Sequence, residues 1–279
     1  MSHEEGPATD PRVPGDFGGP RGIDTGVAHS ARVHDYWLGG KDNFAADRAG
    51  GDAVLAAYPG IIASVRANRA FLARVVRFLA AEAGISQFLD IGTGIPAVNN
   101  THEVAQSAAP GAHVVYVDYD PVVLVHAKAL LRSYPGGTVS YVHEDLRAPD
   151  AILADAAGTL DFSRPVAVML IAIMHLIGDQ DDPYGIVKTL MAAVPSGSYL
   201  ALSQVASDIE AEQMADAAKR YNRLAHETQR HRSHAEVARF FNDLELVEPG
   251  LVPVQQWRPG SEIEALQRSA MWGGVARKP

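Results

Sequence analysis

The chain has 279 residues, of which 47% are hydrophobic and 20% are charged, and its formal net charge is −9. Because it contains no cysteine, disulfides, thiolate nucleophiles and cysteine-ligated metal sites are excluded. The composition is typical of a globular protein, and the acidic charge argues against tight, non-specific binding of nucleic acid.

The N-terminal part of the chain reads as a tail followed by helices. The first 28 residues are rich in Gly, Pro and Asp and lack an apolar run, which excludes a signal peptide and predicts a disordered tail over 1–28. Residues 29–84 are predicted to form a helical cap or lid. Within it, Ala31–Asn43 (ARVHDYWLGGKDN) does not resemble a plain amphipathic helix. From Phe44 to Ala83 apolar residues recur at steps of three and four, and Pro59 divides this pattern into two helices.

Residues 85–279 are predicted to form one α/β domain, because short apolar runs alternate with helical segments. The expected strands are Gln87–Ile91, His113–Asp118, Val139–His143, Val166–Ile173 and Tyr199–Gln204. The expected helices between them are Asn99–Ala108, Pro121–Ser133, Pro149–Ala157 and Pro183–Val194. Ser207–Phe241 is predicted as one long, charged and solvated helix, and the apolar segments Leu244–Val254 and Ala270–Ala276 as an antiparallel pair. No stretch approaches the roughly 18 uninterrupted apolar residues of a membrane span, and we expect a cytoplasmic protein.

Acidic residues end three of the predicted strands, at the edge where doubly wound sheets bind ligands. Asp90 precedes a loop, 92–94, whose two glycines allow a tight turn and a close ligand approach. Asp118 ends the second strand, where a carboxylate can accept both hydroxyls of an adenosine ribose. Asp145, beside the apolar Leu146, ends the third strand and can accept the amino group of an adenine. An isolated Asp after a strand is usually a turn or cap residue, but the three together favour an adenosyl pocket.

The motifs FLDIGTG, VVYVDYDP, EDL and AIMHL resemble those of the class I S-adenosylmethionine-dependent methyltransferases. The strings ARVHDYWLGGKDNFAADR, DDPYGIVKTL and LVEPGLVPVQQWRP are similar to one largely actinobacterial family, long carried as a domain of unknown function and now classed with the methyltransferases. The resemblance covers nearly everything from Ser30 to Pro279. It implies a Rossmann-like fold with a seven-stranded mixed sheet, helices on both faces, and a last strand inserted antiparallel beside the fifth.

The resemblance also implies S-adenosylmethionine as the cofactor. The residues expected to bind it are Asp90, Gly92, Thr93, Gly94, Asp118, Tyr119, Asp145, Leu146, Ala172, Tyr36 and Asn43. The third glycine position of the motif is occupied by Pro96, which is tolerated in the first turn of a helix because its missing N–H would be unpaired there. No metal site is expected, because the spacing of His226, His231 and His234 does not give a metal-binding pair.

Several other side chains have two interpretations each. His175, after the fourth strand, is the candidate catalytic base for an acceptor hydroxyl, or it lines the cofactor pocket. Tyr36 or Phe44 covers the sulfonium, or both dock the N-terminal segment onto the domain. Arg66 and Arg69 reach the methionine carboxylate, or they occupy an exposed helix face.

The function expected from these features is methyl transfer to a small-molecule acceptor. The fourth strand lacks the Asn/Asp-Pro-Pro-aromatic signature of methyltransferases that act on nucleic-acid bases or glutamine, which counts against such acceptors. Two alternatives stay open at this point. Gly92-x-Gly94-x-x-Ala97 also fits a dinucleotide fingerprint and hence an NAD-dependent oxidoreductase, and a non-catalytic S-adenosylmethionine-binding protein would have the same pocket.

Overall fold

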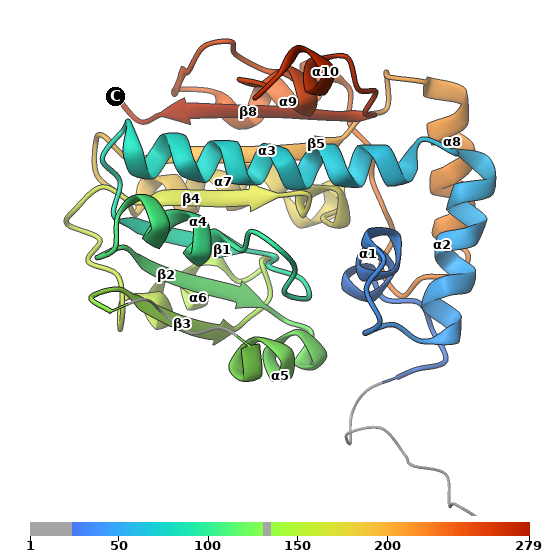
Figure 1. The fold of residues 1–279 in the computed structure, drawn as a ribbon, viewed down its shortest axis with the longest axis horizontal. Coiled ribbons are helices and arrows are strands. Elements are labelled where there is room, and N and C mark those ends of the chain that lie inside the picture. Colours follow the sequence, from blue (N-terminus) through green and yellow to red (C-terminus); the bar gives the residue numbers. More distant parts are fainter. Residues whose placement is uncertain (1–23, 131–134) are drawn as a thin grey trace, which may run out of the picture.

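The computed structural model describes residues 24–130 and 135–279, which form a mixed sheet with helices on both faces (Figure 1). The strands of the described part are β1 (Gln87–Ile91), β2 (His113–Asp118), β3 (Thr138–His143), β4 (Ala167–Ile171), β5 (Tyr199–Val205), β6 (Glu245–Leu246), β7 (Val252–Pro253) and β8 (Met271–Arg277). Their order is β3-β2-β1-β4-β5-β8-β6, with β7 also paired to β8. The first five strands are parallel, and β8 lies antiparallel between β5 and β6. The predicted seven-stranded arrangement is therefore confirmed, with the two-residue β7 as an addition.

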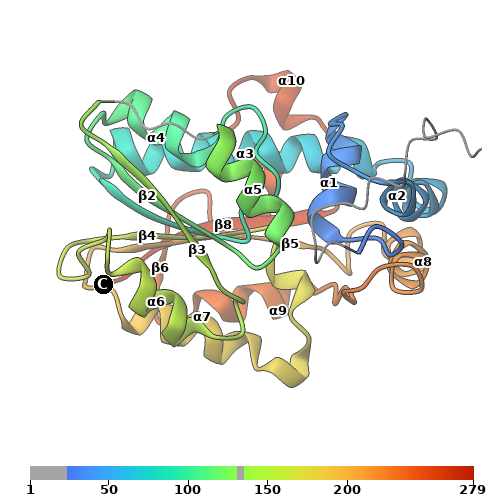
Figure 2. The ribbon, with the colours of Figure 1, turned by 90° about the horizontal axis from the view of Figure 1, so that it is seen from below.

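Helices cover both faces of this sheet (Figure 2). The α-helices of the described part are α1 (Ser30–Leu38), α2 (Ala45–Ala57), α3 (Ile61–Ala81), α4 (Thr101–Ala108), α5 (Pro121–Leu130), α6 (Pro149–Ala156), α7 (Pro183–Ala192), α8 (Ala211–Tyr221), α9 (His234–Ala238) and α10 (Glu262–Ala265). Alternate residues of β1 point to opposite cores: Phe88 packs with the cluster that includes α3, and Leu89 packs with the cluster that includes α6 and α7. Since both faces are covered, all five residues of β1 are buried, as expected for a central parallel strand.

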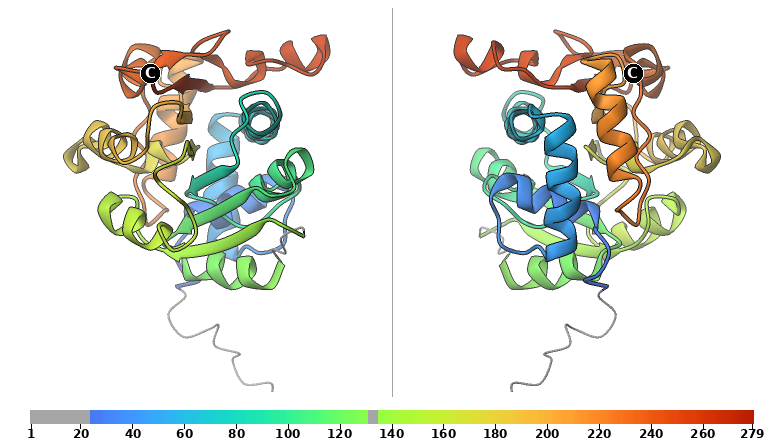
Figure 3. Two further views of the ribbon diagram at one scale, coloured as in Figure 1. Left: turned by 90° about the vertical axis from the view of Figure 1, so that its left-hand side faces the viewer. Right: turned by 90° about the vertical axis from the view of Figure 1, so that its right-hand side faces the viewer.

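Helices α1 and α2 and the start of α3 gather beyond the carboxyl ends of the parallel strands, together with α8 (Figures 1 and 3). Helices α2 and α8 lie side by side, and a separate apolar cluster joins them to α1 and to the start of α3. Tyr58 and Ile61 in this cluster flank the break at Pro59, so the two predicted helices are confirmed as α2 and α3. Among the described residues, no helix combines the length and the apolar character needed to cross a membrane.

The segment Ala31–Asn43 contains a regular helix, contrary to the prediction. Val33 and Trp37 of α1 are buried on one side, so a narrow apolar stripe is enough to dock it. The helix ends at Gly39, which has a φ of 84° and donates its N–H to the carbonyl of Tyr36 (3.0 Å). The paired glycines therefore terminate a helix, rather than indicating its absence.

The predicted long helix over Ser207–Phe241 was also wrong, because α8 ends at Tyr221. The side chain of Asn222 accepts a hydrogen bond from the backbone N–H of Gln229 (2.7 Å) and donates one to its carbonyl (3.2 Å), which closes a loop. His226 lies in this loop and donates its N–H to the carbonyl of Ala28 (3.0 Å). The loop thus ties α8 to the N-terminal segment.

The predicted tail and the predicted helix Pro121–Ser133 each extend into residues that the structure does not describe. Residues 1–23 of the predicted tail and 131–133 of the predicted helix Pro121–Ser133 lie outside the described residues. The predicted end of the tail at residue 28 is too late in the sequence. Ala28 is buried, and the carbonyls of Asp24 and Val27 accept hydrogen bonds from Arg32 (3.0 and 2.9 Å).

Candidate functional site

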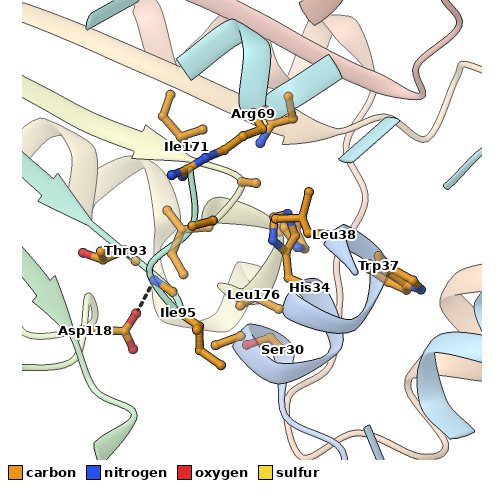
Figure 4. A pocket seen from close by; sticks show the side chains of 18 of the residues that line it. Ser30, His34, Trp37, Leu38, Arg69, Thr93, Ile95, Asp118, Ile171 and Leu176 are labelled. Atoms are coloured by element: carbon orange, nitrogen blue, oxygen red, sulfur yellow. Dashed lines mark hydrogen bonds between the residues drawn. The ribbon is translucent and has the colours of Figure 1, made fainter. Parts of the chain in front are cut away.

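A cavity lies at the carboxyl ends of β1, β2 and β4, with α1 across it (Figure 4). Its empty volume is about 960 Å³, part of it open to solvent. The lining includes six of the residues predicted from the strand ends: Asp90, Gly92, Thr93, Gly94, Asp118 and Tyr119. Ala172 and His175 complete the predicted residues that the structure brings together here.

The glycine loop forms one wall of this cavity. Gly92 has a φ of 76° and Gly94 a φ of 65°, a region that side chains with a Cβ rarely adopt. A Cβ on Gly92 would lie 2.5 Å from the side chain of Ile173, which is another wall residue. Helix α4 begins only at Thr101, so the prediction that Pro96 lies in the first turn of a helix was wrong. Pro96 lies in an irregular loop, where its missing N–H leaves no helical hydrogen bond unmade.

Asp118 is fixed by the backbone around it. Its two carboxylate oxygens accept the N–H groups of Gly94 (2.9 Å) and Asp120 (3.0 Å), so it connects the glycine loop to the end of β2. Burial raises the pKa of Asp118 to about 6, although these two hydrogen bonds act in the opposite direction. The side chain therefore presents a carboxylate to the cavity at neutral pH.

Asp90 and Arg69 supply opposite charges to the same cavity. Burial raises the pKa of Asp90 to about 6, and its carboxylate accepts a hydrogen bond from the hydroxyl of Thr101 (2.6 Å). The guanidinium of Arg69 donates to the carbonyl of Val98 and to Oδ1 of Asn100, both at 2.9 Å, and its Nη1 has no hydrogen-bond partner among residues 24–130 and 135–279. Arg66 is exposed and does not line the cavity, so of the two arginines only Arg69 lies at the site.

His29, at the start of α1, connects three parts of the chain over this cavity. Its ring nitrogens lie 3.0 Å from a carboxylate oxygen of Asp120 and 3.0 Å from one of Glu227, and Nε2 is 3.1 Å from the hydroxyl of Tyr119. Burial alone would lower the pKa of His29, but the two carboxylates raise it to about 10. We call this arrangement of His29, Asp120 and Glu227 the His29 clamp; it fastens the N-terminal segment to the end of β2 and to the loop after α8.

His175 lies in the short 3₁₀ turn Met174–Leu176 that follows β4. Burial, with the nearby charges, lowers its pKa to about 3, and its Nδ1 is buried without a hydrogen-bond partner in the described part of the chain. Arg232, whose side chain is fully buried, holds this turn by donating to the carbonyls of Met174 (2.7 Å) and Ile177 (2.9 Å). The imidazole is thus a fixed, neutral wall of the cavity.

Four predicted cofactor-binding residues lie away from the cavity lining. Tyr36 donates its hydroxyl to Asp52 (2.7 Å), and the amide of Asn43 donates to Asp35 (2.9 Å). Phe44 also lies outside the lining and packs under the guanidinium of Arg32, 5.3 Å from its ring centre, so the docking interpretation fits both aromatic residues.

Asp145 and Leu146 are the other two predicted cofactor-binding residues that lie away from the cavity lining. Asp145 is partly exposed and pairs with Arg147 (3.1 Å), whose N–H it also accepts (2.8 Å), because the arginine follows it by only two residues. Leu146 is buried in the core beneath β1 and β2. The structure thus places these four side chains outside the cavity lining, and their part in cofactor binding stays a prediction.

The sequence reasoning missed His29, Glu227 and Gln229. The first two form the clamp, and Gln229 lines the cavity. No local pattern marks any of them, because they come from segments nearly 200 residues apart in the chain that only the tertiary fold brings together.

The match to known proteins is extensive. Residues 18–279 match the family described as S-adenosyl methyltransferase. The chain belongs to this family. Its name gives S-adenosylmethionine as the cofactor, and the resemblance inferred from the sequence motifs is therefore confirmed.

Two solved structures are similar over almost their whole length. A protein of the DUF574 family from Streptomyces avermitilis is 48% identical, with a TM-score of 0.89, and the match covers 92% of this chain and 99% of that one. A protein from Thermobifida fusca, provisionally assigned as a methyltransferase, is 42% identical, with a TM-score of 0.84 and coverage of 94% and 99%. The source organisms agree with the actinobacterial character of the predicted family.

More distant structures agree in fold alone. A S-adenosylmethionine-dependent methyltransferase from Anabaena variabilis is 12% identical with a TM-score of 0.51, over 92% of this chain and 99% of that one. A search of the curated proteins found no match.

Proposed function

We propose that the protein transfers a methyl group from S-adenosylmethionine to a small-molecule acceptor. The observation that carries this proposal is the combination of Asp118, Asp90 and Arg69 in one cavity of this family's fold. S-adenosylmethionine carries a ribose diol, an ammonium and a carboxylate, and each of the three side chains complements one of these groups.

Each side chain has the charge that its proposed role needs. Asp118 would accept the ribose hydroxyls, as a carboxylate at the end of the second strand does in related nucleotide sites. Asp90 would offset the ammonium, and the unpartnered Nη1 of Arg69 would bind the carboxylate. The positive φ values of Gly92 and Gly94 keep the backbone close to the ligand without a Cβ in between.

The chemistry places modest demands on the protein. A bound sulfonium supplies an already activated methyl group, so the chain has to hold the acceptor in line and exclude water. Helix α1 covers the cavity and performs the second task. His175, with a pKa of about 3, is a weak base at neutral pH, and we assign it to the cavity wall as a hydrogen-bond acceptor.

Calorimetric titration of the full chain tests this proposal. We expect S-adenosylmethionine and S-adenosylhomocysteine each to bind at a single site and to compete with one another. NAD should neither bind nor compete, because a hydride-transfer site has no need for Asp90 beside the glycine loop or for Arg69 at the cavity. Binding of NAD without binding of S-adenosylmethionine would refute the proposal.

The affinity for S-adenosylmethionine should rise up to about 100-fold between pH 5 and pH 7, about tenfold for each of two carboxylates. In this window Asp118 and Asp90, each with a pKa of about 6, lose their protons, and the charged forms bind the cofactor. The cavity histidines do not change charge here, because the pKa values of His34 and His175 are about 4 and 3 and that of His29 is about 10. Titration calorimetry at several pH values measures the effect.

The matched variant for this pH dependence is Asp118→Asn, which removes one of the two titrating carboxylates. In this variant the affinity for S-adenosylmethionine should depend less steeply on pH. An unchanged slope in the variant would assign the pH dependence to groups other than Asp118.

A further inference from the structure

A second cavity lies behind the first, between α1, α2, α3 and α8. Its empty volume is about 520 Å³. Most of its wall is apolar: Trp37, Val54, Tyr58, Ile61, Val65, Ala172, Val205, Met214, Ala217, Ala270 and Met271. Its polar wall residues are His34, Ser64, His175, Gln229 and His231. We call it the inner cavity, and the one described above the outer cavity.

The two cavities share one wall. His34, Trp37, Ala172, His175 and Gln229 line both. In Figure 4, His34 and Trp37 project from α1 beside the outer cavity. The two cavities therefore adjoin at these residues, so a molecule in the inner cavity lies next to one in the outer cavity.

The cavities differ in charge. The outer cavity has the carboxylates of Asp90 and Asp118 and the guanidinium of Arg69, whereas no Asp, Glu, Lys or Arg of the described residues lines the inner one. Its histidines are neutral at pH 7, because burial lowers the pKa of His175 to about 3 and the pKa values of His34 and His231 to about 4. A charged molecule placed there would have no counter-ion, which is a large penalty in a buried site.

The unpartnered polar groups of the inner cavity are concentrated at the shared wall. Tyr58 and Ser64 hydrogen-bond one another (3.1 Å), and Nε2 of His231 lies 3.0 Å from Oε1 of Gln229. By contrast, Nδ1 of His175 is buried without a hydrogen-bond partner among the described residues, and the ring of His34 makes no hydrogen bond to any of them. These two histidines therefore leave acceptor nitrogens available where the two cavities meet.

We infer that the inner cavity binds the methyl acceptor, and that the acceptor is an uncharged, mainly apolar small molecule whose one O–H or N–H group faces His34 and His175. This inference rests on the proposed function, and it adds the class of the acceptor to it. In the transfer, the acceptor oxygen or nitrogen forms a bond to the methyl carbon as the methyl–sulfur bond breaks and its electron pair stays on sulfur. The acceptor oxygen or nitrogen, made acidic by its new bond to the methyl group, then releases its proton to water, while the imidazoles only orient the acceptor group.

The first test compares two probes of similar shape on the full chain saturated with S-adenosylhomocysteine. 2-Naphthol is uncharged with a single hydroxyl, and 6-hydroxy-2-naphthoate adds a carboxylate. Measured by calorimetry or by naphthol fluorescence, 2-naphthol should bind, and 6-hydroxy-2-naphthoate should bind at least about tenfold more weakly, because its carboxylate has no partner. Equal affinity for the two probes, or no binding of 2-naphthol, would overturn the inference.

A matched pair of variants on α8 locates the site. Ala217 is buried in the wall of the inner cavity, and Ala215 is exposed on the same helix. Ala217→Leu should weaken 2-naphthol binding at least about tenfold by filling the cavity, whereas Ala215→Leu should leave it unchanged. Equal binding by the two variants would place 2-naphthol elsewhere and overturn the inference. If Ala217→Leu does not fold, Met214→Phe, another wall residue of α8, takes its place.

Binding of S-adenosylhomocysteine distinguishes a failure of the acceptor class from a failure of the proposed function. Neither Ala217 nor Ala215 lines the outer cavity, so both variants should bind S-adenosylhomocysteine like the wild type. If the wild type binds S-adenosylhomocysteine but does not discriminate between the naphthols, the acceptor class is wrong and the proposed function stands. If it binds no S-adenosylhomocysteine, the proposed function itself fails.

Discussion

Replacing Asp118 by alanine should weaken the binding of S-adenosylmethionine at least about 100-fold. Two hydrogen bonds from ribose hydroxyls to a carboxylate contribute on the order of 3 kcal/mol together, which corresponds to roughly this factor. The substitution also releases the N–H groups of Gly94 and Asp120, so the glycine loop loses its connection to β2. Calorimetric titration of the purified variant measures the affinity, and circular dichroism checks that the fold is retained.

Asp145→Ala is the matched control for this experiment. It removes the same group from the end of the neighbouring strand, but Asp145 pairs with Arg147 outside the cavity lining. We expect the affinity of this variant to stay within about threefold of the wild type, a difference of less than 1 kcal/mol. The ribose site would be misplaced if Asp118→Ala bound normally, and the adenine assignment first made for Asp145 would be restored if Asp145→Ala lost binding.

His29→Ala should lower the free energy of unfolding by about 3–5 kcal/mol, the usual cost of removing one partner from a buried ion pair. In the variant, the carboxylates of Asp120 and Glu227, 4% and 8% exposed, lose the cation between them. The effect should depend on pH with a definite sign. Because the pKa of His29 is raised from 6.5 to about 10, its stabilisation is complete below pH 6.5 and is lost as pH rises through 10.

Urea denaturation of both proteins at pH 6.5 and at pH 10 measures this prediction. The difference between wild type and variant should shrink at the higher pH. His226→Ala is the control, since His226 is an exposed histidine in the same loop as Glu227, and its substitution should change stability by less than about 0.5 kcal/mol. A His29 variant as stable as the His226 variant would show that the clamp does not hold the N-terminal segment.

The sheet could be predicted because each of its parallel strands is marked by a short local sequence pattern. Each of the five parallel strands is a short apolar run bounded by turn residues, and the predicted bounds of β1 and β2 agree with the structure at both ends. The centre of the site could be predicted for the same reason. A glycine loop after β1 and an acidic end of β2 must meet in a parallel sheet, so Asp90, Gly92, Gly94 and Asp118 could be placed in one cavity from sequence alone.

The remaining site residues could not be found in this way, because they depend on long-range contacts. The loop after α8 turns back through the hydrogen bonds of Asn222 to Gln229, an interaction that hydrophobic periodicity does not reveal. The structure also places Asp145 outside the cavity lining, which its position in the sequence did not predict. It occupies the expected strand end, yet a neighbouring cation, Arg147, turns its carboxylate into a local ion pair.

Helix α1 gives the protein a means of linking its two ligands. Because His34 and Trp37 line both cavities, any free energy that one ligand contributes to ordering α1 is free energy that the second ligand no longer has to supply. By thermodynamic linkage the coupling is reciprocal, so cofactor and acceptor must change each other's dissociation constants by the same factor. The nine-residue helix α1 would thus couple the two proposed binding equilibria, although the two ligands would occupy different parts of adjoining cavities.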